Sequence, residues 1–117
     1  MHAVARTRSD LDVLAASSGG RTTAWVADVT SDAFLAQLEA LPALDVLVNN
    51  AGMNLPLPIE DVDVATLDAM LALNVRAVYR TSQAAVRAML RAGRGGSIIH
   101  MSSQMGHVGA PRRTVYC

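Results

Sequence analysis

The sequence predicts an α/β protein with a parallel sheet and helices on both faces, and three observations support this. Short apolar runs alternate with helical patterns along the 117 residues. Residues 46–48 form a continuous apolar run, which is typical of a strand buried on both faces of a parallel sheet. From about Thr66 to Leu90 the apolar residues recur every three or four positions, as on one helix face. This alternation predicts a doubly wound sheet in a three-layer α/β/α arrangement.

The first half of the chain contains two predicted strand–helix pairs. Residues 3–5 form a short apolar strand, and Gly19-Gly20 ends the helical pattern that follows it. The β-favouring run 22–27 predicts the second strand. Residues 28–31 offer capping chemistry for the next helix, which Pro42 closes. Its apolar residues are Phe34, Leu35, Leu38 and Leu41.

The second half repeats the order with longer elements. Strand 46–48 is followed by a loop over residues 53–60, which contains two prolines. The long helix then runs to about Leu90, and the glycine-rich residues 93–96 stop it. Residues 97–101 are predicted to form the last strand.

Composition excludes several classes of protein. Basic and acidic residues both number 10, and no basic stripe is present, which argues against nucleic acid as a partner. The single cysteine provides no disulfide framework, and no histidine has metal-ligand spacing. No apolar run approaches the roughly 20 residues needed to cross a bilayer, and the N-terminus lacks a signal-peptide pattern. We therefore expect a cytoplasmic protein with no metal site and no second domain.

Polar groups follow each predicted strand at its carboxyl end. Arg6 follows the first strand, Asp28 the second, Asn49 to Gly52 the third, and Ser102-Ser103 the fourth. Ligands of open parallel sheets bind beyond the carboxyl ends of the strands. We therefore expect these groups to lie over one crevice.

The order and spacing of three motifs resemble the short-chain dehydrogenase/reductase family, classical type. These motifs are Asn49-Asn50-Ala51-Gly52, Asn74 within Leu-Asn-Val, and Ser103 thirteen residues before Tyr116. The resemblance extends to 3-oxoacyl-carrier-protein reductases and to sugar or polyol dehydrogenases. It implies a Rossmann-like NAD(P)-binding domain and an oxidoreductase that interconverts a carbonyl and an alcohol by hydride transfer.

The resemblance implies catalytic roles for three residues. Tyr116 exchanges a proton with the substrate oxygen, Ser103 hydrogen-bonds that oxygen, and Asn74 holds a water in a proton relay. A tyrosine has an ordinary pKa of about 10 and needs nearby positive charge to act in this way. Taken alone, the serine–tyrosine spacing means little. Asn74 has the alternative of bonding a neighbouring backbone, because an unpaired amide on an apolar helix face is costly.

The resemblance also implies a cofactor site. Asn50, Ala51 and Gly52 line the adenosine side of the cofactor, and Asp28 and Val29 lie beside its adenine. A strand-terminating turn is the alternative for residues 50–52, and capping of the following helix is the alternative for Asp28.

Arg6 favours NADP over NAD, because an arginine at this strand end suits a 2′-phosphate. NAD remains possible, and a solvated surface arginine is the alternative reading. The substrate is expected to be a small carbonyl or alcohol, and it is not readable from these residues.

Two family features lie outside the sequence: the first strand with its glycine-rich turn, and the lysine four residues after the tyrosine. Residues 1–117 are therefore expected to be an incomplete Rossmann-like domain, from the second family strand to the catalytic tyrosine. Such a fragment should be inactive, marginally stable and left with unpaired sheet edges. The parent protein is expected to be a homo-oligomer. The alternative function is a catalytically dead nucleotide-fold module for binding or dimerisation through the long helix.

Overall fold

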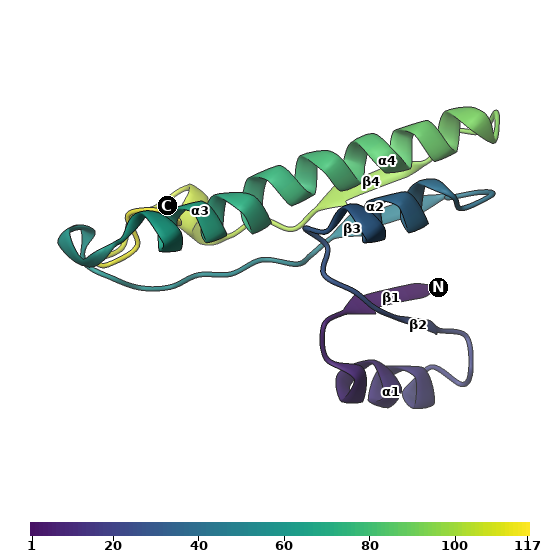
Figure 1. Cartoon of the computed structure of the whole chain (residues 1–117), viewed down its shortest axis with the longest axis horizontal. Helices are drawn as coiled ribbons and strands as arrows, with labels where there is room; N and C mark the ends of the chain where they lie inside the picture. Colours follow the sequence, from purple (N-terminus) through teal and green to yellow (C-terminus); the bar gives the residue numbers. More distant parts are fainter.

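The computed structural model describes all residues 1–117, and it has the expected α/β order (Figure 1). Four short strands alternate with four α-helices, and 3-10 turns occupy Ile59–Asp61 and Gln104–Gly106. In chain order the strands and helices are β1 (His2–Ala5), α1 (Arg8–Ser17), β2 (Thr23–Val26), α2 (Asp32–Glu39), β3 (Val46–Asn49), α3 (Val64–Leu71), α4 (Val78–Arg91) and β4 (Ser97–His100). The predicted fold class is confirmed.

The strands form two separate parallel pairs in place of the one sheet that the sequence predicted. In the first pair β1 lies beside β2, with His2 opposite Thr23. In the second pair β3 lies beside β4, with Val46 opposite Ser97. No ladder joins β1 to β3, although both strands run in the same direction in Figure 1. The sheet is therefore divided into two halves.

The backbone of β1 and β3 is paired on one side only. Met1 and Ala5 accept from Thr23 and Ala27 of the β2 side. Backbone groups alternate along a strand, so those of His2 and Val4 point away from β2.

The same alternation holds in β3, where Asp45 and Asn49 accept from Ser97 and Met101. The backbone groups of Val46 and Val48 therefore point away from β4. Both unpaired edges border one cavity, because its lining includes His2, Val4, Val46 and Val48.

A small apolar cluster holds the two halves together. Phe34, Leu35 and Leu38 of α2 pack with Ala84 of α4, since α2 presents residues of one helical face. Partly buried side chains from both halves surround this cluster: Val4, Trp25, Ala27, Val29, Leu41 and Leu44. The core is thin, as 11 of 117 residues are buried.

Ion pairs border the contact between α2 and α4. Arg80 meets Asp32 at 2.7 Å, and Arg87 and Arg91 meet Glu39 at 3.5 and 3.8 Å. These side chains are substantially exposed, so each pair contributes little, roughly 0–1 kcal/mol.

Local signals explain where the helices begin and end. The Ser31 hydroxyl accepts from the Phe34 N–H at the start of α2, and Asp63 accepts from the Thr66 N–H at the start of α3. Gly19 and Gly93 have φ values of 62° and 64°, a left-handed region in which glycine ends a helix without strain. Both expected helix stops are confirmed.

The predicted helix over 66–90 is present as a longer run from Val64 to Arg91, with an interruption. Residues Ala72–Ala77 form a π-helical turn between α3 and α4. Such turns are rare and occur frequently at functional sites. Asn74 lies within this turn.

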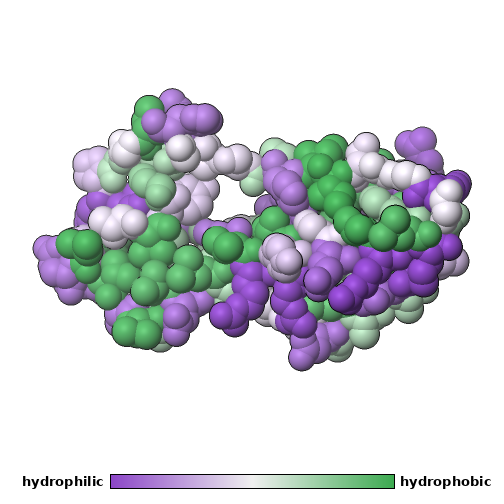
Figure 2. Space-filling model, turned by 90° about the horizontal axis from the view of Figure 1, so that it is seen from above, coloured by the Kyte–Doolittle hydropathy of each residue, from purple (hydrophilic) through white to green (hydrophobic).

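Apolar side chains remain on the surface of the helical layer. Val75, Tyr79 and Leu90 are 59%, 69% and 74% exposed. Figure 2 shows broad hydrophobic areas between hydrophilic residues on the face seen from above. None of the helices combines the length and the apolar character required to traverse a bilayer.

Candidate functional site: a cavity between the two half-sheets

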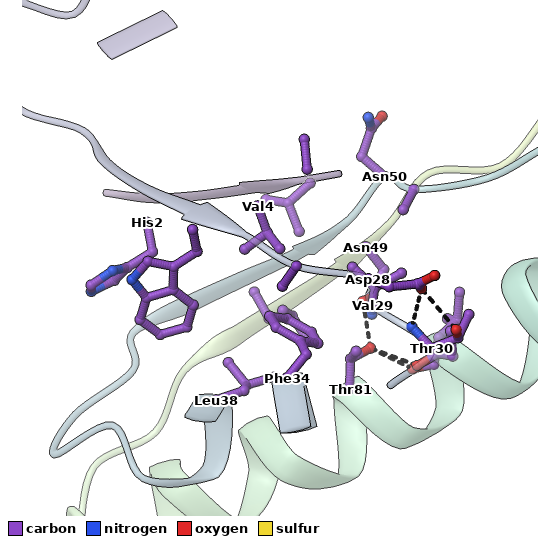
Figure 3. A pocket seen from close by; sticks show the side chains of 18 of the residues that line it. His2, Val4, Asp28, Val29, Thr30, Phe34, Leu38, Asn49, Asn50 and Thr81 are labelled. Atoms are coloured by element: carbon purple, nitrogen blue, oxygen red, sulfur yellow. Dashed lines mark hydrogen bonds between the residues drawn. The ribbon is translucent and has the colours of Figure 1, made fainter. Parts of the chain in front are cut away.

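A cavity of about 1150 Å³ lies between the two half-sheets. Phe34 and Leu38 of α2 and Thr81 of α4 contribute to its lining, and Figure 3 shows them around it. All six predicted cofactor-binding residues line it: Arg6, Asp28, Val29, Asn50, Ala51 and Gly52. The ends of β1, β2 and β3 supply these residues, as expected for carboxyl ends of parallel strands.

Asp28 is held by Thr30. One carboxylate oxygen accepts from the backbone N–H of Thr30 at 2.8 Å and from its hydroxyl at 2.7 Å (Figure 3). These two bonds hold the pKa of Asp28 below its ordinary value of 3.8, and the positive charge of Arg6 adds to the effect. Ser31, and not Asp28, caps α2, so the alternative role expected for Asp28 as the helix cap is wrong. The second carboxylate oxygen of Asp28 has no protein partner.

Arg6 is an exposed cation without a protein partner. It forms no side-chain hydrogen bond or ion pair, whereas Arg8 bonds Asp12 at 2.9 Å. Arg6 and Asp28 therefore place one free donor group and one free acceptor atom at the same cavity.

Asn74 fixes the loop that leaves β3. Its Oδ1 accepts from the Met53 N–H at 2.9 Å, and its Nδ2 donates to the Met53 carbonyl at 2.8 Å. A methyl group added to Gly52 would lie 3.4 Å from Asn74 Oδ1. The amide thus bonds neighbouring backbone, which is the alternative that the sequence left open, and it sets the position of Gly52.

Ser103 and Tyr116 lie outside this cavity, so the expectation that all four strand ends meet over one crevice holds for three of them. The Ser103 hydroxyl accepts from the Met105 N–H at 3.1 Å and caps the turn Gln104–Gly106. Tyr116 is half-buried, and its N–H donates to Arg113. A parallel bridge between Leu57 and Arg113 ties this C-terminal segment to the loop before α3.

A second, smaller hollow of about 310 Å³ lies on another side of the π-helical turn. Asn74 borders it, together with Tyr79, Ser82 and His100. The structure therefore places the predicted cofactor residues and the predicted catalytic asparagine at two different hollows.

Sequence reasoning placed Asn49 at the crevice as part of its motif but missed its partners Thr81 and His100. Thr81 lines the cavity, and His100 borders the smaller hollow. Thr81 is the one buried polar residue of the protein, and its hydroxyl donates to Asn49 Oδ1 at 2.7 Å (Figure 3). Asn49 Nδ2 lies 3.2 Å from His100 Nδ1. A threonine on the apolar face of a predicted helix was the available signal, because such a hydroxyl needs a partner.

Comparisons with known proteins give the class of protein. The sequence model of the short chain dehydrogenase family matches residues 1–117. The chain is 35% identical over 115 residues to the L-xylulose reductase of Mesocricetus auratus, covering 98% of this chain and 47% of that enzyme. The chain belongs to the short-chain dehydrogenase family.

Solved structures agree with this assignment. A crystal structure described as a candidate betaketoacyl-ACP reductase superposes with a TM-score of 0.87 at 32% identity, over 98% of this chain and 48% of that chain. The closed form of a serine dehydrogenase complexed with NADP+ superposes with a TM-score of 0.85 at 27% identity, with the same coverage of 98% and 48%. The chain thus spans about half the length of the relatives it matches.

Proposed function

We propose that the chain forms part of an NAD(P)-dependent oxidoreductase that interconverts a carbonyl and an alcohol. The observation that carries this proposal is the meeting of six predicted cofactor-binding residues at the end of the cavity where β1, β2 and β3 end; the rest of the cavity runs along the unpaired edges of β1 and β3. They come from the ends of three strands that lie up to 46 positions apart in sequence, from Arg6 to Gly52. Membership of the family supports the reaction class.

The cavity residues fit an adenine dinucleotide, with NADP preferred over NAD. Arg6 offers an unpaired guanidinium for a 2′-phosphate, and Arg–phosphate pairs are among the stronger hydrogen bonds. The free oxygen of Asp28 can accept from an adenine amine. The small residues Ala51 and Gly52 let a flat ligand approach the backbone. When bound, the nicotinamide would supply or accept the hydride.

The proposed catalytic groups are Asn74, Ser103 and Tyr116. Ser103 would donate to the substrate oxygen and orient it, and Tyr116 would exchange a proton with the same oxygen. A phenol works as acid or base when nearby positive charge stabilises the phenolate. Asn74 would act through the loop at Gly52, because both polar atoms of its side chain are already bonded to the Met53 backbone.

Nucleotide binding can be tested on the chain itself by NMR titration with 2′,5′-ADP and with 5′-AMP. We expect amide shifts at the six cavity residues, and tighter binding of 2′,5′-ADP. Arg6→Gln should remove this preference and weaken 2′,5′-ADP binding about tenfold or more. Arg8→Gln is the matched control, because Arg8 pairs with Asp12. Equal binding of both nucleotides by the unmodified chain would contradict the NADP assignment.

We propose further that residues 1–117 alone do not turn over, and that the substrate is a small carbonyl or alcohol. Incubation with NADPH and reactive ketones, followed at 340 nm, tests the first statement. Consumption of NADPH above the background of a Tyr116→Phe variant would contradict it. A cytoplasmic location and a homo-oligomeric parent protein remain expectations.

A dimerisation or binding module without catalysis is the second candidate. The unpartnered apolar residues Val75, Tyr79 and Leu90 on the helical layer favour it. Sedimentation of the chain and of a Leu90→Lys variant distinguishes the two candidates. A dimer that Leu90→Lys dissociates, together with no response to either nucleotide, would favour this module over the enzyme.

A further inference from the structure

Side-chain hydrogen bonds join α4 to the ends of β3 and β4, and the proposed chemistry does not use them. Thr81 bonds Asn49 Oδ1 at 2.7 Å. Asn49 Nδ2 donates to Ser82 Oγ at 3.1 Å and lies 3.2 Å from His100 Nδ1. Ser82 Oγ in turn donates to the Val78 carbonyl at 2.7 Å. We call this set, Asn49, Thr81, Ser82 and His100, the polar brace.

The distances in the polar brace favour one arrangement of donors and acceptors. The Thr81 hydroxyl lies 2.7 Å from Asn49 Oδ1, closer than to the carbonyls of Ala77 at 2.9 Å and Val78 at 3.1 Å. The Ser82 hydroxyl donates its single hydrogen to the Val78 carbonyl, so its oxygen accepts from Asn49. The amide nitrogen of Asn49 therefore points toward Ser82. Asn49 Oδ1 then faces Thr81, and the Thr81 hydroxyl donates to this oxygen, its nearest acceptor. In this arrangement the second hydrogen of Asn49 Nδ2 points to His100, and His100 Nδ1 accepts it. The imidazole therefore carries its proton on Nε2.

The polar brace lies directly before three of the residues that line the cavity. Asn49 is the last residue of β3, and Asn50, Ala51 and Gly52 follow it directly. Thr81 is only 4% exposed, and loss of its hydroxyl removes the donor that Asn49 Oδ1 has in the protein.

We propose that Thr81 is a positioning residue, which acts through Asn49 to fix residues 50–52 at the cavity, with His100 as the neutral Nε2–H partner. The effect on nucleotide binding rests on the proposed function. The brace itself does not, and it is tested without any ligand.

The first experiment reads the tautomer of His100 directly. The ¹⁵N shifts of the imidazole distinguish an Nδ1 acceptor from an Nδ1–H donor, and we record them at pH 8, where an imidazole is neutral. We expect the Nε2–H form for His100, and His107 serves as a reference because no hydrogen bond involves its side chain. An Nδ1–H tautomer at His100 would overturn the proposal.

The second experiment separates hydrogen bonding from packing. Thr81→Val keeps the shape of the side chain and removes the hydroxyl, whereas Thr81→Ser keeps the hydroxyl and removes a methyl group. We expect Thr81→Val to displace the Asn49 side-chain amide signals and to speed amide exchange about tenfold at Met53, whose N–H is hydrogen-bonded after residues 50–52. Thr81→Ser should leave both close to those of the unmodified chain. The opposite order, with the serine variant more perturbed, would mean that Thr81 only fills space and would overturn the proposal.

A nucleotide titration of the same variants then tests the consequence. Thr81→Val should weaken 2′,5′-ADP binding severalfold relative to Thr81→Ser. If the unmodified chain binds no nucleotide while the tautomer and exchange results hold, the proposed function fails and the brace stands. If nucleotide binds equally to both variants, the positioning role fails and the proposed function stands.

Discussion

For Asn74, the sequence predicted that the side chain needs a hydrogen-bond partner but did not predict which partner it has. A polar amide on an apolar helix face was expected to have partners, because leaving it unpaired is costly. Its partner, the Met53 backbone, lies 21 positions earlier and across a loop, and no local pattern specifies such a pairing. The same holds for Thr81 and Asn49, which are 32 positions apart. The residue type predicted that each side chain needs a hydrogen-bond partner, and only the fold shows which residue that partner is.

Replacing Asn74 by leucine should loosen the loop after β3. The variant leaves the Met53 N–H and carbonyl unpaired, at a cost of roughly 1–3 kcal/mol. We expect faster amide exchange at Met53 and a lower midpoint of urea unfolding. Gln83→Leu is the control, because Gln83 is exposed on α4 and makes no side-chain hydrogen bond. Equal effects of the two changes would contradict the role of Asn74.

Asp28 and Asp63 should both titrate below 3.8, because each accepts hydrogen bonds from a threonine that favour the charged form. Thr30→Val removes one donor and should raise the pKa of Asp28 while leaving Asp63 unchanged. A lowered carboxyl pKa adds stability that is present above 3.8 and is lost as the pH falls through the lowered value. Carboxyl ¹³C shifts between pH 2 and 6 measure both groups. An unchanged Asp28 titration in Thr30→Val would show that the hydroxyl bond is unimportant.

Among the secondary-structure elements, the strands and helices were easier to predict than the irregular turn within the long helix. Apolar periodicity placed all four strands and the helices close to their observed bounds, because burial follows the strand and helix repeats. The π-helical turn at Ala72–Ala77 was not predicted. One inserted residue hardly changes an apolar rhythm of three and four, and the turn depends on the distant Asn74–Met53 contact.

Gly96, just before β4, should not tolerate alanine. A methyl group there would lie 2.8 Å from the Asp45 carbonyl and 2.7 Å from the sulfur of Met89. We expect Gly96→Ala to lower the free energy of unfolding by roughly 1–3 kcal/mol, because the backbone contact cannot yield easily. Gly95→Ala is the matched control, since nothing lies within 4 Å of its added methyl group. Urea unfolding of both variants makes the comparison. Similar midpoints would show that β4 shifts freely to make room.

For the whole molecule, the divided sheet and thin core agree with the expectation of unpaired edges, whereas marginal stability and aggregation stay predictions. The sequence could indicate strands, but it could not by itself give their spatial order. Strand order depends on which edges meet, and β1 and β3 do not meet. Ser103 and Tyr116 illustrate the same limit, because their motif spacing does not say which cavity they face.

Amide exchange along β1 and β3 should alternate. We expect fast exchange at His2, Val4, Val46 and Val48, whose N–H groups face the cavity, and slower exchange at Ala3, Ala5, Leu47 and Asn49. Hydrogen–deuterium exchange by NMR at low protein concentration measures this. Dilution is the control, since protection of the first set that appears only at high concentration would indicate edge pairing between molecules. Uniform protection in dilute samples would contradict the divided sheet.

The arginine side chains on α4 make the edge of the α2–α4 contact sensitive to salt concentration. Arg80, Arg87 and Arg91 form direct ion pairs with Asp32 and Glu39 at the exposed surface, where 1 M sodium chloride shortens the range of electrostatic attraction to about 3 Å. The apolar cluster of Phe34, Leu38 and Ala84 beneath them is not screened in this way. Concentrated salt should therefore loosen the rim of the α2–α4 contact first and leave its centre closed.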